Sequence, residues 1–200
     1  MSKTPSNAGY AENAEALVRQ YEALSFAAVH RDVLHLIPSA PSRVLDVGAG
    51  TGRDAAALAA LGHKVVAVEP TRELSDHGRR LHADVQIEWI DDGLPDLRTL
   101  FKTPRRFDLI LLTAVWMHLD PLERRLAMGI LADLLAPAGT LVMSLRHGPV
   151  PEGRRMFDVR ASETVDLARR HGLAVVHESA RDDAGRRPGV HWTILGFRRL

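Results

Sequence analysis

The feature that most constrains the fold of this chain is an apolar run that ends in closely spaced glycines. Residues 44–47 precede a glycine-rich turn at 48–52, and an alanine-rich stretch follows at 54–61. An apolar run that stops at glycines is typical of a buried parallel strand turning into a helix. Glycine suits such a turn because a ligand can approach a backbone that carries no Cβ. A second apolar run, 65–68, ends at Glu69, so this order predicts the nucleotide-binding half of a doubly wound α/β sheet.

The spacing of the glycines separates two classes of nucleotide site. The dinucleotide fingerprint is G-x-G-x-x-G. Here Gly48, Gly50 and Gly52 give G-x-G-x-G, and Arg53 stands where the third fingerprint glycine would fall. The fingerprint is not met, so a nicotinamide-dependent enzyme is the less favoured interpretation.

The G-x-G-x-G form, with Asp46 before it and Glu69 after the second strand, resembles the motif of class I S-adenosylmethionine-dependent methyltransferases. The resemblance implies S-adenosyl-L-methionine as cofactor, with S-adenosyl-L-homocysteine as product. It also implies that the glycine turn wraps the methionine and ribose, and that Glu69 binds the ribose hydroxyls. The alternative is a glycine-rich turn that serves only the strand–helix junction. The cofactor-binding residues that the resemblance assigns are Asp46, Gly48, Ala49, Gly50, Gly52, Glu69, Pro70, Asp91, Asp92, Thr113 and Ala114.

Composition limits the other classes of protein. The 200 residues, 46% of them hydrophobic, suffice for one domain with a large core. The formal net charge of +1 gives no strong field toward nucleic acid or a membrane, so neither is an expected partner. The absence of cysteine excludes disulfides, thiolate metal sites and a cysteine nucleophile, and no metal site is predicted from the scattered histidines. No long apolar run or signal-like start is present, so we expect a cytoplasmic protein.

The start of the chain predicts a cover over the cofactor site. Residues 1–9 are small and polar and are expected to be a disordered leader, followed by a single domain over 10–200. Apolar residues recur at helical spacing over 10–38, which indicates one broken helix or two. The family resemblance implies that these helices form a lid whose aromatic side chains face the substrate. The candidates are Tyr10, Tyr21 and Phe26, and the alternative is that these aromatics pack in the core.

After Glu69 the sequence predicts a helix over 71–83, capped by Thr71, and a third strand over 85–90. In-out alternation along this strand places Asp91 on the pocket side. The resemblance implies that an acidic residue here reaches the adenine amino group. Asp91 is the first choice and Asp92 the second; otherwise both cap a turn.

Residues 106–113 form the most strand-like run and predict the fourth, central strand, buried on both faces. The segment that follows, 114–119, is where methyltransferases place the substrate. It lacks the Asn/Asp-Pro-Pro-aromatic tetrad of enzymes that methylate amino groups of DNA bases, and resembles the small-molecule and tellurite-resistance-like branches. His118 is a candidate general base, and Trp116 a candidate substrate contact. The alternative for His118 is a hydrogen bond to a backbone group that fixes the loop.

The next helix is predicted to open at Asp120-Pro121, and a strand follows at 140–145. The predicted apolar face of this helix consists of Leu122, Leu126, Ile130, Leu131, Leu134 and Leu135. The loop 146–157 then lies at the carboxyl end of this strand, on the ligand side of the sheet. Its cationic side chains suggest an anionic group on the substrate, because guanidinium pairs bidentately with carboxylate or phosphate. The alternative is a solvated basic loop. The side chains in question are Arg146, His147, Arg154 and Arg155.

The remainder predicts a capped helix over 162–172 and two strands, 173–177 and 190–198, joined by a charged, exposed hairpin tip at 181–189. The resemblance then implies a Rossmann-like sheet of seven strands, mostly parallel with an antiparallel last strand and helices on both faces. The expected activity is methyl transfer to a small-molecule acceptor, in which the protein mainly aligns and desolvates the reactants. A tRNA or protein methyltransferase using the same cofactor site is the alternative. The oligomeric state is open between monomer and homodimer.

Overall fold

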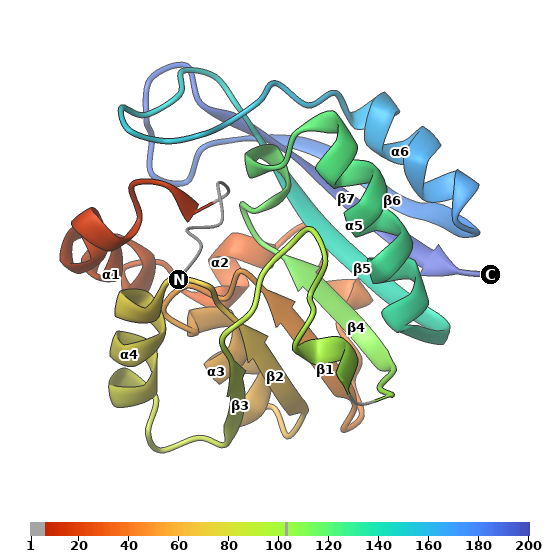
Figure 1. Cartoon of the computed structure of the whole chain (residues 1–200), viewed down its shortest axis with the longest axis horizontal. Coiled ribbons are helices and arrows are strands. Elements are labelled where there is room, and N and C mark those ends of the chain that lie inside the picture. The colour runs from red at the N-terminus through yellow and green to blue at the C-terminus, as the bar shows by residue number, and fades with distance from the viewer. Residues whose placement is uncertain (1–6, 103) are drawn as a thin grey trace.

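A seven-stranded sheet forms the centre of the structure, a computed structural model that describes residues 7–102 and 104–200. Five strands pair in parallel, and β7 pairs antiparallel with both β5 and β6. The order across the sheet is β3-β2-β1-β4-β5-β7-β6 (Figure 1). This confirms the predicted Rossmann-like fold with an antiparallel last strand. The strands are β1 (Arg43–Val47), β2 (Lys64–Val68), β3 (Ile87–Ile90), β4 (Phe107–Leu112), β5 (Leu135–His147), β6 (Leu173–Asp182) and β7 (His191–Arg199).

Helices cover both faces of this sheet and divide the core in two. Alternate residues of each buried strand point to opposite faces. One face packs against α5 and α6, and the other against α3 and the segment around Val33 and Leu36. Near the amino terminus, α1 lies beside α4 (Figure 1). The helices are α1 (Ala14–Glu22), α2 (Phe26–His30), α3 (Arg53–Ala60), α4 (Arg72–Leu81), α5 (Pro121–Leu134) and α6 (Ala161–Arg170), with 3-10 turns at Ala11–Asn13, Leu34–Leu36, Leu100–Lys102 and Trp116–His118.

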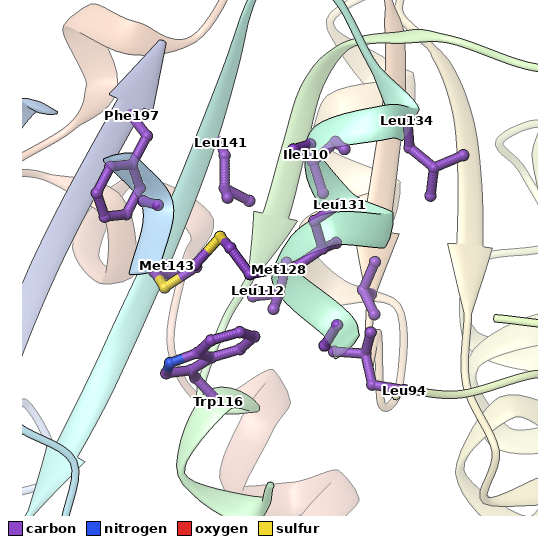
Figure 2. Packing of buried hydrophobic residues seen from close by; sticks show 14 of the residues in the cluster. Leu94, Ile110, Leu112, Trp116, Met128, Leu131, Leu134, Leu141, Met143 and Phe197 are labelled. Atoms are coloured by element: carbon purple, nitrogen blue, oxygen red, sulfur yellow. The ribbon is translucent and has the colours of Figure 1, made fainter. Parts of the chain in front are cut away.

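Trp116 belongs to the larger core rather than to a binding site. Its side chain is fully buried, and Figure 2 shows the indole below the side chains of Met128 and Met143. The indole Nε1 donates a hydrogen bond to Thr164 Oγ1 at 3.2 Å. The predicted substrate contact of Trp116 is therefore wrong. An indole buries a large apolar area, and its one polar atom already has a partner here.

Helix α5 begins as predicted, and its buried face agrees with the prediction in part, because Leu131, Leu134 and Leu135 are buried. Asp120 and Glu123 form a reciprocal capping box, with Pro121 in the first turn. Leu122 and Leu126, however, are 72% and 51% exposed, while Met128 and its neighbours a helical turn apart are buried. At 3.6 residues per turn, Leu122 lies on the opposite side of the helix from Leu131, and Leu126 from Met128. The larger apolar cluster, which contains Met128 and Leu131, determines which side faces the core.

The structure differs from the sequence predictions at the ends of three elements, α4, α6 and β6. Thr71 occupies the cap position of α4, but its side chain makes no capping hydrogen bond. Helix α6 begins at Ala161 without a side-chain cap, and β6 extends to Asp182, beyond the predicted end at 177.

Of the expected leader, residues 1–6 lie outside the described residues, and residues 7–9 form a turn that leads into the domain. Within the described chain, every helix is too short or too polar to span a bilayer.

Candidate functional site

A cavity of about 570 Å³ lies at the carboxyl ends of the parallel strands. This volume falls in the range of small-molecule sites, and the position is the ligand side of an open α/β sheet. Several parts of the chain line it. Among them are the amino-terminal segment with α1, the glycine turn after β1, the ends of β2 and β4, the segment after β3, the end of β5 with the loop that follows, and the tip of the β6–β7 hairpin.

The glycine turn needs glycine for two separate reasons. Gly48, Gly50 and Gly52 have φ values of +71°, +57° and +79°, which side chains rarely adopt. Space is also closed at two of them: a Cβ on Gly48 would lie 2.5 Å from Val115 Cγ2, and one on Gly52 would lie 2.7 Å from the Trp89 ring. Gly48 and Gly50 line the cavity, as does Ala49, whereas Gly52 does not and serves the start of α3.

Glu69 ends β2 with its carboxylate held in the cavity wall. It is only 6% exposed, and its two oxygens accept hydrogen bonds from the backbone N–H groups of Gly50 (2.7 Å) and Thr71 (2.8 Å). Burial raises the pKa of this carboxyl, although the two amides oppose the shift. Pro70 also lines the cavity. The structure therefore fixes the Glu69 carboxylate beside the glycine turn.

Two further acids are buried below the turn. Asp46 is 1% exposed, and its Oδ2 has no hydrogen-bond partner among the described residues. Burial raises its pKa well above the usual value. Asp54 was not identified from the sequence, and it accepts hydrogen bonds from His30 Nε2 (2.8 Å), Arg53 Nε (2.8 Å) and Thr113 Oγ1 (2.9 Å). Burial alone would raise the Asp54 pKa, but His30 and Arg53 hold it below its ordinary value.

The two aspartates after β3 do not line the cavity. Asp92 accepts hydrogen bonds from the backbone N–H groups of Gly93, Thr99 (2.7 Å) and Leu100 (2.9 Å), so it caps the following turn. Asp91 is exposed, and Gly93 and its neighbour Leu94 form the cavity wall instead. For Asp92 the turn-capping alternative describes the structure, whereas an adenine contact by Asp91 stays a prediction.

His118 lines the cavity and is held by hydrogen bonds on both ring nitrogens. Its Nδ1 lies 2.7 Å from the Arg155 carbonyl oxygen, and its Nε2 lies 2.9 Å from the Tyr10 hydroxyl. A carbonyl only accepts, so Nδ1 carries the proton and Nε2 accepts from Tyr10. Burial lowers the pKa of His118, and nearby arginines lower it further. The lowered pKa favours the neutral ring at neutral pH, although the hydrogen bond to the Arg155 carbonyl opposes the shift. The backbone contact expected of the alternative interpretation is present.

The aromatic residues of the amino-terminal helices divide between the cavity and the core. Tyr10 and Tyr21 both line the cavity, and the Tyr21 ring lies over Gly50, where an added Cβ would come within 3.5 Å of it. Phe26 instead packs against His30, with ring centroids 4.6 Å apart, and joins the smaller core. For Phe26 the predicted role in substrate binding is therefore wrong. Thr113 and Ala114, after β4, line the cavity, and their contact with the cofactor stays a prediction.

The four cationic residues at the end of β5 and in the loop that follows separate into two pairs. Arg146 and Arg154 line the cavity. Arg155 does not, because it pairs with Asp120 (3.1 Å) and Glu123 (2.8 Å) and donates to the His118 carbonyl. His147 donates to or accepts from Thr193 Oγ1 and stacks on another histidine outside this cavity. Arg155 thus positions the loop that carries His118, and the predicted substrate contact is wrong for it.

The tip of the β6–β7 hairpin also forms part of the cavity, which the sequence did not indicate. Asp183 is only 7% exposed and accepts hydrogen bonds from Arg187 Nη2 (2.7 Å) and Trp192 Nε1 (2.8 Å). The hydrogen bonds from Arg187 lower the pKa of Asp183. Most of the tip is exposed, as predicted, but Asp183 is buried, because a charge in a turn resembles a solvated one until its partners are known. The lining residues of this hairpin are Arg181, Asp183, Ala184, Arg187 and Trp192.

Comparison with known proteins identifies the family. A family model described as a methyltransferase domain matches residues 17–175. The chain belongs to this family, and its fold is that of class I S-adenosylmethionine-dependent methyltransferases, as the glycine motif predicts.

Individual relatives are similar over part of their length. A demethylmenaquinone methyltransferase of Clavibacter sepedonicus is 34% identical over 124 residues, 61% of this chain and 49% of that protein. A protein-L-isoaspartate O-methyltransferase of Stenotrophomonas maltophilia is 32% identical over 149 residues, 68% of this chain and 55% of that protein. The chain thus spans about half the length of these curated relatives.

Solved structures show the same fold. The 1,6-didemethyltoxoflavin-N1-methyltransferase of Burkholderia thailandensis, with S-adenosylhomocysteine bound, gives a TM-score of 0.74 at 21% identity, covering 96% of this chain and 85% of that one. A TehB-like S-adenosylmethionine-dependent methyltransferase of Corynebacterium glutamicum gives 0.70 at 20% identity, covering 94% and 99%.

Proposed function

We propose that this protein transfers a methyl group from S-adenosylmethionine to a small-molecule acceptor. The observation that carries the proposal is the convergence of the glycine turn and the buried Glu69 carboxylate on one cavity of about 570 Å³. The names of several relatives support a small acceptor, among them ubiquinone biosynthesis and demethylmenaquinone methyltransferases and the toxoflavin-precursor enzyme.

The residues present fit the cofactor. Gly48 and Gly50 leave the cavity wall free of side chains where the backbone must approach a ligand. The Glu69 carboxylate is suited to accept hydrogen bonds from ribose hydroxyls. Asp46 Oδ2 is buried and lacks a partner, so it offers an acceptor to a cationic ammonium group. An orphaned buried acceptor is costly unless a ligand satisfies it.

When bound, S-adenosylmethionine supplies a methyl group attached to a positively charged sulfur. The chain then has to align the acceptor and exclude water, which converts an encounter in solution into an oriented reaction. Tyr10 and Tyr21 cover the cavity from the amino-terminal side. Neutral His118 holds a lone pair on Nε2, which accepts the proton of an acceptor hydroxyl in place of the Tyr10 hydrogen bond. An acceptor that is not protonated needs no such base.

Calorimetric titration with S-adenosylhomocysteine tests the cofactor assignment. Wild-type protein is expected to bind it saturably, and Glu69→Ala to bind it at least about tenfold more weakly, since hydrogen bonds to a charged group contribute roughly 1.5–3 kcal/mol. Glu178→Ala is the matched control, because Glu178 is exposed and lies outside the cavity. Absence of binding by the folded wild type contradicts the proposal.

A protein acceptor is the second candidate. The observation in its favour is the similarity to the isoaspartate O-methyltransferase of Stenotrophomonas maltophilia. Incubation with S-adenosylmethionine carrying a labelled methyl group separates the two candidates. Label recovered in small molecules supports the first, and label recovered in an aged, isoaspartate-containing peptide supports the second.

A further inference from the structure

Two arginines in the cavity wall have no ion pair with an acidic residue among residues 7–102 and 104–200. Arg146 is 7% exposed, and its buried Nε has no hydrogen-bond partner in the described part of the chain. Its Nη1 reaches only the sulfur of Met156, at 3.9 Å. Arg154 likewise has a buried Nη1 without a partner, and its guanidinium stacks on the Tyr10 ring at 3.5 Å from the centroid. Buried donors without acceptors are rare because each costs free energy.

The acids near these arginines are already used by other cations. Asp183 accepts from Arg187, and Arg181 pairs with Asp32 at 3.3 Å. Glu152 lines the cavity but is exposed, and the structure gives it no ion pair with Arg146 or Arg154. Burial lowers the pKa of Arg146 and the positive charge of Arg187 lowers it further, although Asp183 opposes the shift. Within the described residues, Arg146 and Arg154 therefore have no carboxylate in direct contact.

The charge of these arginines lies away from the glutamate that ends β2. Arg146 is in β5, and Glu69 follows β2, with β1 and β4 between these strands. Three spacings of about 4.8 Å separate β2 from β5, so the two positions are about 14 Å apart along the sheet. The arginines thus lie beside the part of the cavity that also contains Tyr10 and His118.

We propose that Arg146 and Arg154 form an anion subsite that binds a carboxylate or phosphate group of the methyl acceptor. The guanidinium forks supply paired N–H donors that match the oxygens of either group. An acceptor anchored there presents its remaining atoms to the neighbouring His118. That the bound anion belongs to a methyl acceptor rests on the proposed methyl transfer. That an anion binds here rests on the two unpartnered guanidinium groups.

Titration with simple anions tests the subsite without knowledge of the acceptor. Wild type, Arg146→Gln and Arg154→Gln are titrated calorimetrically with inorganic phosphate and with benzoate, each with and without saturating S-adenosylhomocysteine. Wild type is expected to bind at least one anion saturably, and each variant to bind it about tenfold or more weakly, as expected for a lost charge-assisted hydrogen bond. Preference for phosphate indicates a phosphate ester, and preference for benzoate indicates a carboxylate. Arg160→Gln is the control, since Arg160 is exposed and outside the cavity.

Several outcomes overturn the inference. Equal anion binding by wild type and both variants does so, as does wild type that binds S-adenosylhomocysteine but neither anion; in both cases the proposed function still stands. Loss of S-adenosylhomocysteine binding in either folded variant assigns the arginines to the cofactor instead. Wild type that binds anions through the arginines but not S-adenosylhomocysteine refutes the proposed function and leaves only the anion site. Arg154→Gln, in a half-buried loop, keeps the test decisive if Arg146→Gln fails to fold.

Discussion

The hydroxyl of Tyr10 donates a hydrogen bond to Nε2 of His118, 2.9 Å away and 108 residues further along the chain. The two rings meet edge to face, with centroids 5.5 Å apart. Since Nδ1 of the same imidazole is held by the Arg155 carbonyl, this contact joins the amino-terminal segment to the loops after β4 and β5. The cover of the cavity and its candidate base are therefore one connected unit.

A double-mutant cycle measures this connection. Tyr10→Phe removes the donor and His118→Leu removes the acceptor, so the free energy of unfolding of the double variant should exceed the additive expectation by about 0.5–1.5 kcal/mol. Denaturant unfolding of the four proteins gives the coupling. Strict additivity would show that the contact contributes nothing.

The buried imidazole also predicts a pH dependence of stability. Burial lowers the His118 pKa in the folded protein, so the unfolded chain takes up a proton at a higher pH than the folded one. The unfolding free energy contributed by this residue is therefore retained above the unfolded pKa of about 6.5 and lost as the pH falls below it. His118→Gln should lose less stability than wild type between pH 6.5 and 5.5. Denaturant unfolding at each pH measures this, with the range from pH 7 to 8, where the two should run parallel, as internal control.

Gly78 in α4 should resist a substitution that usually stabilises helices. Alanine in a helix interior is favoured over glycine by roughly 0.5–1 kcal/mol. A Cβ on Gly78, however, would lie 2.4 Å from the Thr51 carbonyl oxygen in the glycine turn. We expect Gly78→Ala to destabilise the protein by about 1–3 kcal/mol. Gly129→Ala in α5 is the control, because its Cβ would meet only the exposed His171 side chain, at 3.2 Å. A gain in melting temperature for Gly78→Ala would refute the close approach.

Replacing Ala138 by glycine should stabilise the protein. Ala138 lies in β5 between Leu135 and Thr140, where the register with β4 shifts, and its φ is +59°, a conformation that costs a side-chain-bearing residue about 1–2 kcal/mol. Ala138→Gly relieves this strain and is expected to raise the free energy of unfolding by about 1 kcal/mol. The greater entropy of glycine in the unfolded chain reduces this gain. Ala136→Gly, at a neighbouring position without positive φ, should instead lower it. Chemical denaturation compares the two variants, and equal shifts of the same sign would contradict the argument.

The sequence by itself determined the sheet half that carries the glycine turn, the buried central strand and the acid after β2. These features depend on patterns local in the chain, because buried strands follow apolar runs and a tight turn with positive φ favours glycine. The tertiary structure decided which charges and aromatic rings face the cavity. Trp116 is buried in the core, Arg155 forms ion pairs, and the hairpin around Asp183 lines the cavity. Whether a charged or aromatic side chain is exposed, paired or free to bind a ligand depends on partners brought together only by folding, often from more than a hundred residues away.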